Sequence, residues 1–315
     1  MVILIISIFC SNFLLKLLLP SLNKNLIDKP NQRSSHTSPC ITGGGVAFII
    51  VHLAISIFLS NYNQNLNSTL NITMSCLPLA IVGFIDDYKG VRNYIRFSIQ
   101  IIVSILIIYS SNIVQIENNF ILSSVVYIFL AITSCTVINF TNFMDGLDGL
   151  VAGCMTVIFI VCAISINQSN SILALIGALI GFLFLNWHPA KVFMGDVGST
   201  YLGAIYIGFV YLSTTWDQAL GLILVSTPLM SDALICLIRR FISKQSIFKA
   251  HKLHLYQRLH QAGLSHNLVS IIYILGCIAM GIAFLGWGLK ASLCLAFVEI
   301  FVGYLLDRRV ATAFY

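Results

Sequence analysis

Charged residues are scarce in this 315-residue chain: Lys, Arg, Asp and Glu make up 9% of it, whereas apolar residues make up 58%. The mean hydropathy is +0.93. No soluble core of this size could bury so many apolar side chains, so the composition excludes a soluble globular protein and predicts an integral membrane protein. We expect residues 1–315 to form a single membrane domain, because no repeat, low-complexity tract or linker divides the chain.

Paired cysteines and a continuous basic stripe are also missing. The nine cysteines are scattered, and no two are spaced as C-x-x-C. This spacing excludes a disulfide framework and argues against a zinc site. The formal charge is +6, but the basic residues flank apolar runs, which favours a lipid bilayer over nucleic acid as the partner.

Apolar segments of roughly the twenty residues that cross a bilayer are abundant. Eleven windows, the third of them short, fall at about 2–20, 43–60, 72–85, 94–110, 120–138, 150–166, 171–187, 198–213, 219–238, 267–285 and 288–305. Threading the chain through them places nearly all Lys and Arg on one side, which is therefore the cytoplasmic side, and only Lys290 clearly violates this rule. The predicted fold class is an all-α polytopic membrane protein with about 11 transmembrane helices and cytoplasmic active-site loops.

The densest polar string is N-F-T-N-F-M-D-G-L-D-G, which runs from Asn139 to Gly149 and includes Asn142, Asp145 and Asp148. A carboxylate within a bilayer costs several kcal/mol, so both aspartates are expected where a helix meets water and a charged ligand. An ordinary helix-capping turn is the alternative, because Asp is favoured in a first helical turn.

The string G-F-I-D-D-Y-K-G contains the adjacent carboxylates of Asp86 and Asp87. Adjacent carboxylates repel unless a cation or a proton lies between them, which indicates magnesium and phosphate chemistry; a plain polar loop is the alternative. Arg96 and Gln100 follow at i and i+4, so both are expected to face one cavity.

Two further polar strings lie next to predicted apolar segments. In F-M-G-D-V-G-S-T, Asp196 could offer a carboxylate to a metal and Phe193 could stack on a planar base, although a single Phe more often packs against lipid or core. In K-A-H-K-L-H-L-Y-Q-R-L-H, the pair His251 and His254 would share a face if the segment is helical, and could donate to phosphate. A solvated basic loop on an anionic leaflet is the alternative for the histidines.

The first basic loop combines Arg33 and His36 with three consecutive glycines, of which Gly44 is the middle one. Backbone N–H groups at a helix start can hold a phosphate, but glycines serve close helix packing equally well. Asp232 lies inside the ninth window near Arg239 and Arg240, which favours a structural ion pair.

Taken together in this order, the strings GFIDDYKG, NFTNFMDGLDGL, FMGDVGST and HKLHLYQRL resemble those of the polyprenyl-phosphate N-acetylhexosamine-1-phosphate transferases, glycosyltransferase family 4. The resemblance runs from about Arg33 to Arg258. It implies transfer of a sugar 1-phosphate from a UDP-N-acetylated sugar to undecaprenyl phosphate with Mg²⁺ or Mn²⁺, at the cytoplasmic face of a bacterial inner membrane. The histidine string lacks a run of histidines, so it looks closer to the branch that starts O-antigen than to the pentapeptide translocase.

The resemblance also implies roles for individual residues. Asp86 and Asp87 resemble the paired aspartates near the lipid phosphate, and Asp145 and Asp148 the nucleotide-binding aspartates, with Asp145 also near the metal. Phe193 resembles the residue that stacks on uracil, Asp196 the metal ligand, and His251 and His254 the histidines on the donor phosphates. Arg33 and Arg96 would add cationic clamps, Arg96 standing where a lysine is common.

The rival hypothesis is a cation-coupled transporter, which would place its carboxylates near the bilayer midplane rather than at cytoplasmic helix ends. A prenyl synthase is less suited, because D-D-Y-K-G lacks the further aspartate of D-D-x-x-D. The sequence leaves open the identity of the sugar, a one-step or two-step route, and whether the chain forms a homodimer.

Overall fold

The computed structural model describes residues 1–30, 38–62, 67–111, 113, 120–166, 169–246 and 251–314. Most of these residues are helical. The helices are α1 Val2–Asn25, α2 Gly45–Tyr62, α3 Asn67–Lys89, α4 Asn93–Tyr109, α5 Phe120–Met144, α6 Leu150–Ser165, α7 Ser169–Asn186, α8 Gly195–Tyr211, α9 Trp216–Val225, α10 Thr227–Ile242, α11 Leu255–Gln261 and α12 His266–Arg309. One short antiparallel pair, β1 Ile27–Asp28 with β2 Cys40–Ile41, follows α1.

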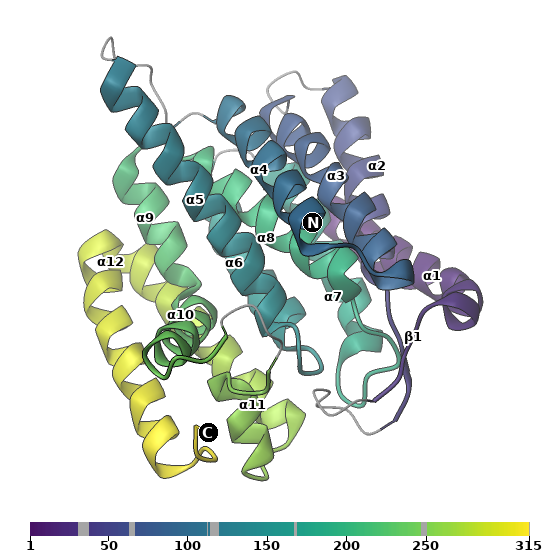
Figure 1. Ribbon diagram of the computed structural model, residues 1–315. Helices are drawn as coiled ribbons and strands as arrows, with labels where there is room; N and C mark the ends of the chain where they lie inside the picture. The colour runs from purple at the N-terminus through teal and green to yellow at the C-terminus, as the bar shows by residue number, and fades with distance from the viewer. Residues whose placement is uncertain are drawn as a thin grey trace.

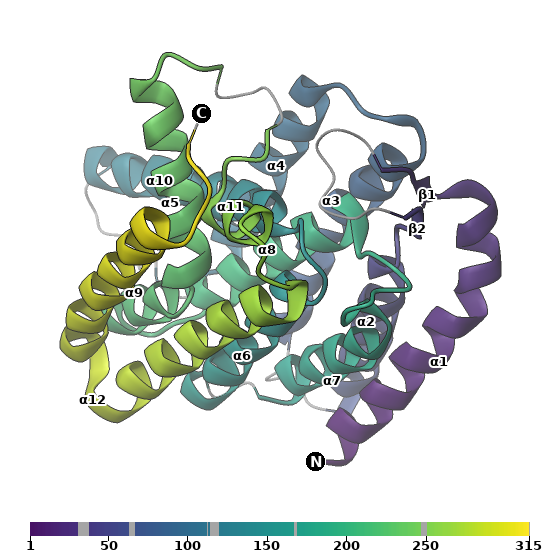
Figure 2. The same ribbon diagram turned by 90° about the horizontal axis from the view of Figure 1, so that it is seen from below.

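Helix α8 lies at the centre of the bundle and packs against α2, α3, α4, α5, α6 and α9 (Figures 1 and 2). All of its residues from Val197 to Tyr211 are buried. Glycines allow this close packing: a Cβ added to Gly45 of α2 would lie 2.5 Å from the Cα of Gly198 on α8. Membrane helices associate through such small residues, because lipid gives apolar side chains no reason to leave it. The start of α8 is therefore fixed beside the start of α2.

Apolar side chains on the outer helices face outward, including Phe9 and Phe13 on α1 and Phe297 on α12. Five described helices are long and apolar enough to cross a bilayer, or six if α9 and α10 count as one bent span. Helices α4, α6 and α7 are apolar but shorter. The all-α membrane fold is thus confirmed, while the predicted count of about 11 spans is not.

Three of the predicted windows contain or adjoin a bend in the structure. Window 219–238 breaks at Ser226 into α9 and α10, which are bent by 76°, and Pro228 occupies the first turn of α10. Proline suits a first turn because it has no N–H to donate. The last two windows form the two helical segments of α12, which meet at a kink at Gly288, where φ is 77°. That left-handed value suits glycine, which lacks a Cβ.

Four polar segments meet at one end of the bundle, the lower end in Figure 1, where α11 and the C-terminus lie. They are the end of α3, the turn between α5 and α6, the loop before α8, and the loop that carries α11. Hydrogen bonds and ion pairs join these four segments, which are far apart in sequence.

Candidate active site

Arg96 joins two of the predicted carboxylates. It lies in the first turn of α4, and its guanidinium contacts Asp86 Oδ2 of α3 at 2.5 Å and Asp196 Oδ2 of α8 at 2.7 Å. The N–H of Val91 also donates to Asp86 Oδ1 at 2.6 Å, which fixes the turn between α3 and α4. Arg96 and Gln100 line one small cavity, as their spacing predicted. The guanidinium of Arg96 thus bridges two carboxylates that come from different motifs.

Asp87 has a different task from its neighbour Asp86. Its carboxylate accepts the backbone N–H groups of Asp196 at 2.9 Å and Val197 at 3.2 Å. These N–H groups belong to the first turn of α8, where no helical carbonyl can accept them. Gly195 precedes them with φ of 73°, and a Cβ there would lie 2.3 Å from Asp87 Oδ2. Asp87 therefore caps α8 and sets the position of Asp196.

Asn142, near the end of α5, completes this group. In the amide orientation that satisfies both of its ends, its nitrogen donates to Asp196 Oδ1 at 3.1 Å and to Ser199 Oγ at 2.6 Å, while its oxygen accepts from Arg96 at 3.1 Å. The side chain of Asn142 thus links α4, α5 and α8. It contacts Arg96 and Asp196, which the sequence also predicted for the site.

Asp145 lies in the turn between α5 and α6. Its carboxylate has no hydrogen-bond donor among the residues that the structure describes. Burial, together with the negative charges of Asp196, Asp87 and Asp148, raises the pKa of Asp145 to about 8. Repulsion of this kind is what a bound cation relieves. The residue as a whole is partly exposed, so it is not sealed within the bundle.

Asp148 is engaged by two histidines that the sequence did not single out. Its carboxylate contacts His188 Nδ1 at 2.6 Å and His266 Nδ1 at 3.3 Å, and accepts the N–H of Ala190 at 3.1 Å. Burial alone would raise the pKa of Asp148, but these partners hold it below its usual value. The Ser270 hydroxyl donates to the Asp148 carbonyl at 2.9 Å. Asp148 thus ties the α5–α6 turn to the loop before α8 and to the start of α12.

Gly44 packs against the loop before α8, and its N–H is used within the protein rather than left free for a ligand. This N–H donates to the Phe193 carbonyl at 2.9 Å, and that of Gly45 donates to the Met194 carbonyl at 3.0 Å. A Cβ on Gly44 would lie 2.6 Å from Val192 Cγ2. These contacts favour the packing alternative for the glycines, because a phosphate would have to displace a backbone hydrogen bond. Phe193 is partly exposed beside them, while Arg33 and His36 lie outside the described residues.

His251 and His254 lie side by side in the loop before α11, so their proximity does not come from sharing a helix face. His254 is the residue before α11, and its ring stacks on that of His251 with centroids 5.0 Å apart. Burial, followed by the nearby His254 and Arg240, lowers the pKa of His251 to about 4, so His251 is neutral at pH 7. Its Nδ1 accepts the Leu253 N–H at 3.2 Å, which leaves the proton on Nε2.

The histidine loop docks on the turn that carries Asp145. The Tyr256 hydroxyl donates to the Phe143 carbonyl at 3.0 Å, and the His254 ring lies 6.2 Å from that of Phe143. A Cβ on Gly146 would lie 2.2 Å from the Tyr256 hydroxyl, so only glycine fits beneath it. Histidines and carboxylates therefore share one end of the bundle.

Comparison with known proteins decides the family. The family model described as glycosyl transferase family 4 matches residues 69–214. A Mycobacterium leprae decaprenyl-phosphate N-acetylglucosaminephosphotransferase is 30% identical over 305 residues, covering 81% of this chain and 75% of that protein. The chain belongs to glycosyl transferase family 4.

Other members of family 4 are similar over comparable lengths. A Prochlorococcus marinus (strain MIT 9515) phospho-N-acetylmuramoyl-pentapeptide-transferase is 30% identical, covering 79% of this chain and 78% of its own. A probable undecaprenyl-phosphate N-acetylglucosaminyl 1-phosphate transferase of Bacillus subtilis is 29% identical, covering 80% of this chain and 75% of its own. The chain is thus a membrane phosphotransferase of family 4, and the names of its relatives differ in the sugar.

The donor atoms of this family 4 site suit a hard divalent cation. The carboxylates of Asp145 and Asp196 offer the oxygen ligands that Mg²⁺ and Mn²⁺ prefer, and the pKa of Asp145 is raised first by burial and then by its neighbours' negative charges. Among the described residues, closely spaced groups of three metal-ligating side chains occur elsewhere, at Asp148 with its two histidines and at Cys236 with His251 and His254. Sequence spacing could not have shown either group, because each draws on distant segments.

Proposed function

We propose that this chain transfers an N-acetylated hexosamine 1-phosphate from a UDP-sugar to undecaprenyl phosphate at the cytoplasmic face of a bacterial inner membrane. The products are a diphosphate-linked lipid sugar and UMP, and the reaction starts an O-antigen or other surface polysaccharide. The observation that carries this proposal is the bridge from Arg96 to Asp86 and Asp196, which puts a cation between acidic groups of two motifs beside the histidine loop. The names of the Bacillus subtilis and Mycobacterium leprae relatives make UDP-N-acetylglucosamine the first donor to test.

The chemical task is to bring two anions together at the edge of a low-dielectric bilayer. Asp196 and Asp145 would hold Mg²⁺ or Mn²⁺, which supplies charge screening and stabilises the leaving UMP. Arg96 holds Asp86 and Asp196 in register and places a permanent positive charge beside them. The neutral His251 offers Nε2–H to a donor phosphate oxygen, and His254 lies against it.

We propose a single in-line step. An oxygen of the lipid phosphate attacks the β-phosphorus of the UDP-sugar, the bond from this phosphorus to the bridging oxygen breaks, and that oxygen leaves with UMP. A phosphate monoester has its second pKa near ~6, so it is already largely dianionic and hardly needs a general base. Asp87 is consistent with this route, because both of its oxygens are bound to the start of α8. A two-step route would instead make an aspartate the nucleophile.

The test is an assay of the purified enzyme with undecaprenyl phosphate, Mg²⁺ and a panel of UDP-GlcNAc, UDP-GalNAc, UDP-FucNAc and UDP-QuiNAc. We expect UMP and a lipid-linked sugar with at least one donor, and loss of both in Asp196→Asn. No UMP with any donor would overturn the proposed function. UMP release with labelled sugar phosphate retained on the protein, in the absence of lipid, would overturn the single-step route.

A further inference from the structure

Asp232 is a buried carboxylate within the otherwise apolar middle of α10. Its residue is 6% exposed. Three hydrogen bonds converge on it, from the backbone N–H of Leu255 at 2.7 Å, the backbone N–H of Tyr256 at 3.1 Å and the Tyr273 hydroxyl at 2.7 Å. Asp232 therefore binds the loop that carries the histidines, a role that its sequence context, which favoured an ion pair with Arg239 or Arg240, did not suggest.

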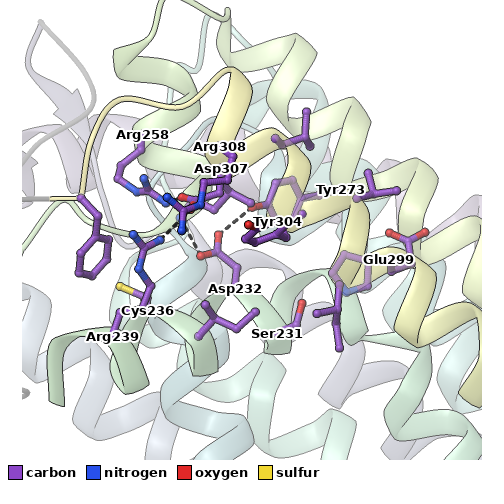
Figure 3. A pocket seen from close by; sticks show the side chains of 18 of the residues that line it. Ser231, Asp232, Cys236, Arg239, Arg258, Tyr273, Glu299, Tyr304, Asp307 and Arg308 are labelled. Atoms are coloured by element: carbon purple, nitrogen blue, oxygen red, sulfur yellow. Dashed lines mark hydrogen bonds and ion pairs between the residues drawn. The ribbon is translucent and has the colours of Figure 1, made fainter. Parts of the chain in front are cut away.

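The contacts of Asp232 join three elements at one point. Leu255 and Tyr256 open α11, and Tyr273 lies on α12. Figure 3 shows Asp232 projecting from α10 toward Tyr273, at the edge of a pocket of about 390 Å³ between α10 and α12. A charged acceptor of backbone N–H groups holds a loop firmly, because such bonds are stronger than those between neutral groups.

His254 immediately precedes the two N–H groups that Asp232 holds. Its ring is buried, with Nδ1 at 3.7 Å from Asp232 Oδ1 and without a hydrogen bond to any described residue. The His254 ring stacks on that of His251, and the rings of Phe143 and Tyr256 also lie beside it. A small rotation of the backbone at Leu255 would move the His254 ring away from Phe143 and hence from the turn that carries Asp145.

We propose that Asp232 is a positioning residue for the donor-binding histidines: it holds the first backbone N–H groups of α11 and thereby sets the place of His254 and His251. This inference rests on the proposed function, because it takes the two histidines as contacts of the donor diphosphate. Asp232 itself touches no substrate. Its effect passes through the position of the loop.

The kinetic test uses Asp232→Asn, which keeps the size of the side chain but loses its charge and one acceptor. We expect kcat/KM for the UDP-sugar to fall by at least tenfold, with KM for undecaprenyl phosphate changed by less than twofold. Asp232→Glu should recover part of the loss, and Tyr273→Phe, which removes one of the three donors, should lose less. Ser231 lines the same pocket, and the structure describes no hydrogen bond from it to the loop. The control variant Ser231→Ala should therefore have the kcat/KM of the wild type.

A double-mutant cycle separates positioning from general damage. If Asp232 acts through His254, then Asp232→Asn should cost less than a further twofold in a His254→Ala background. An equal loss in both backgrounds, or equal changes in KM for donor and lipid, would overturn the proposal. The proposal would also be overturned if the loss of activity equalled the loss of folded protein, measured as the monodisperse peak in size-exclusion chromatography in detergent.

Chemical labelling tests the same inference without transferase activity. Diethylpyrocarbonate modifies exposed imidazoles, and peptide mass spectrometry can follow His254 separately from His260. His254 is 4% exposed, so we expect slow labelling in the wild type and at least fivefold faster labelling in Asp232→Asn, with the rate at His260 unchanged. Unchanged labelling of His254 would overturn the positioning role. Faster labelling in a protein that releases no UMP would uphold it and reject the proposed function instead.

Discussion

At the scale of single residues, Asp145 is set apart by a charge that its surroundings disfavour. Burial and three neighbouring carboxylates raise its pKa to about 8, against an unfolded value of about 3.9. Between these two values the folded protein binds a proton that the unfolded chain has lost, so the stability that Asp145 contributes falls as pH rises through this window. A divalent cation would reverse the penalty by replacing the proton.

We therefore expect metal-free Asp145→Asn to keep more of its stability than the wild type as pH rises from 5 to about 8. Added Mg²⁺ at pH 8 should raise the melting temperature of the wild type and raise that of Asp145→Asn less. The measurement is a thermal melt in detergent across this pH range, with and without chelator. Parallel pH curves for the two proteins would contradict the raised pKa.

Gly195 and Gly90 form a matched pair of glycines with positive φ, at 73° and 71°. Alanine at either site is strained by roughly 1–2 kcal/mol. Only at Gly195 would the new Cβ also strike Asp87, since nothing lies within 4 Å of a Cβ at Gly90.

Both alanine variants should thus lower the melting temperature, Gly195→Ala more than Gly90→Ala because its Cβ also meets Asp87, and Gly195→Ala alone should lower transferase activity by at least tenfold. Activity assays on folded protein from both variants check this difference. Equal activities would show that the position of Asp87 does not matter to the site.

At the scale of elements, α8 is capped from another helix. Asp87 of α3 accepts the N–H groups of Asp196 and Val197, which a local N-cap would normally serve. Asp87→Ala should cost about 1 kcal/mol, so amide exchange in the first turn of α8 should become roughly fivefold faster. Hydrogen exchange followed on a peptide spanning residues 194–200 measures this. Asp86→Ala, which leaves the cap intact, should not speed exchange there.

The candidate site could be predicted from sequence only at the level of which residues gather. Asp86, Asn142, Asp196 and Arg96 were all expected together, and the structure brings them into contact. The division of tasks between Asp86 and Asp87 was not predictable, because it depends on how closely α3 approaches α8. The position of the histidine loop was not predictable for a related reason: the loop is held by Asp232 from α10, and no local pattern encodes that contact.

At the scale of the whole molecule, the C-terminal end of α12 anchors the histidine loop a second time. Asp307 pairs with Arg239 of α10 at 2.9 Å and with Arg258 of α11 (Figure 3). Arg258 also donates to the Thr312 carbonyl at 2.8 Å. The first residues of α11 are thus tied to α10 through Asp232, and Arg258 is tied to α12 through Asp307.

Asp307→Asn would leave Arg258, which is 3% exposed, without its carboxylate. A buried charge that loses its partner is costly, so we expect a loss of about 2 kcal/mol in the free energy of unfolding, reduced from the fully buried case because Asp307 is partly solvated. A thermal melt measures this, with the exposed Arg308→Gln as the control that should change little. An unchanged melting temperature for Asp307→Asn would contradict the second anchor.

The membrane fold followed directly from hydropathy, since composition and periodicity are local properties. The count of about 11 spans is not confirmed, because helices such as α4, α6 and α7 are as apolar as a hydropathy window requires but shorter than the helices that pass as spans. The bend at Ser226 depends on the packing around it and on Pro228, neither of which a sliding window reads.

The cap on α8 also bears on how this enzyme could be recombined with its relatives. Asp87 caps the helix that begins with Gly195 and Asp196. The segment around residue 87 and the segment around residue 195 should therefore come from the same parent protein. A chimera that takes one segment from this chain and the other from a donor with a shifted α3 would lose the position of Asp196, although both donors supply intact motifs. Crossovers that keep α3 and α8 together should therefore be tolerated better than crossovers between them.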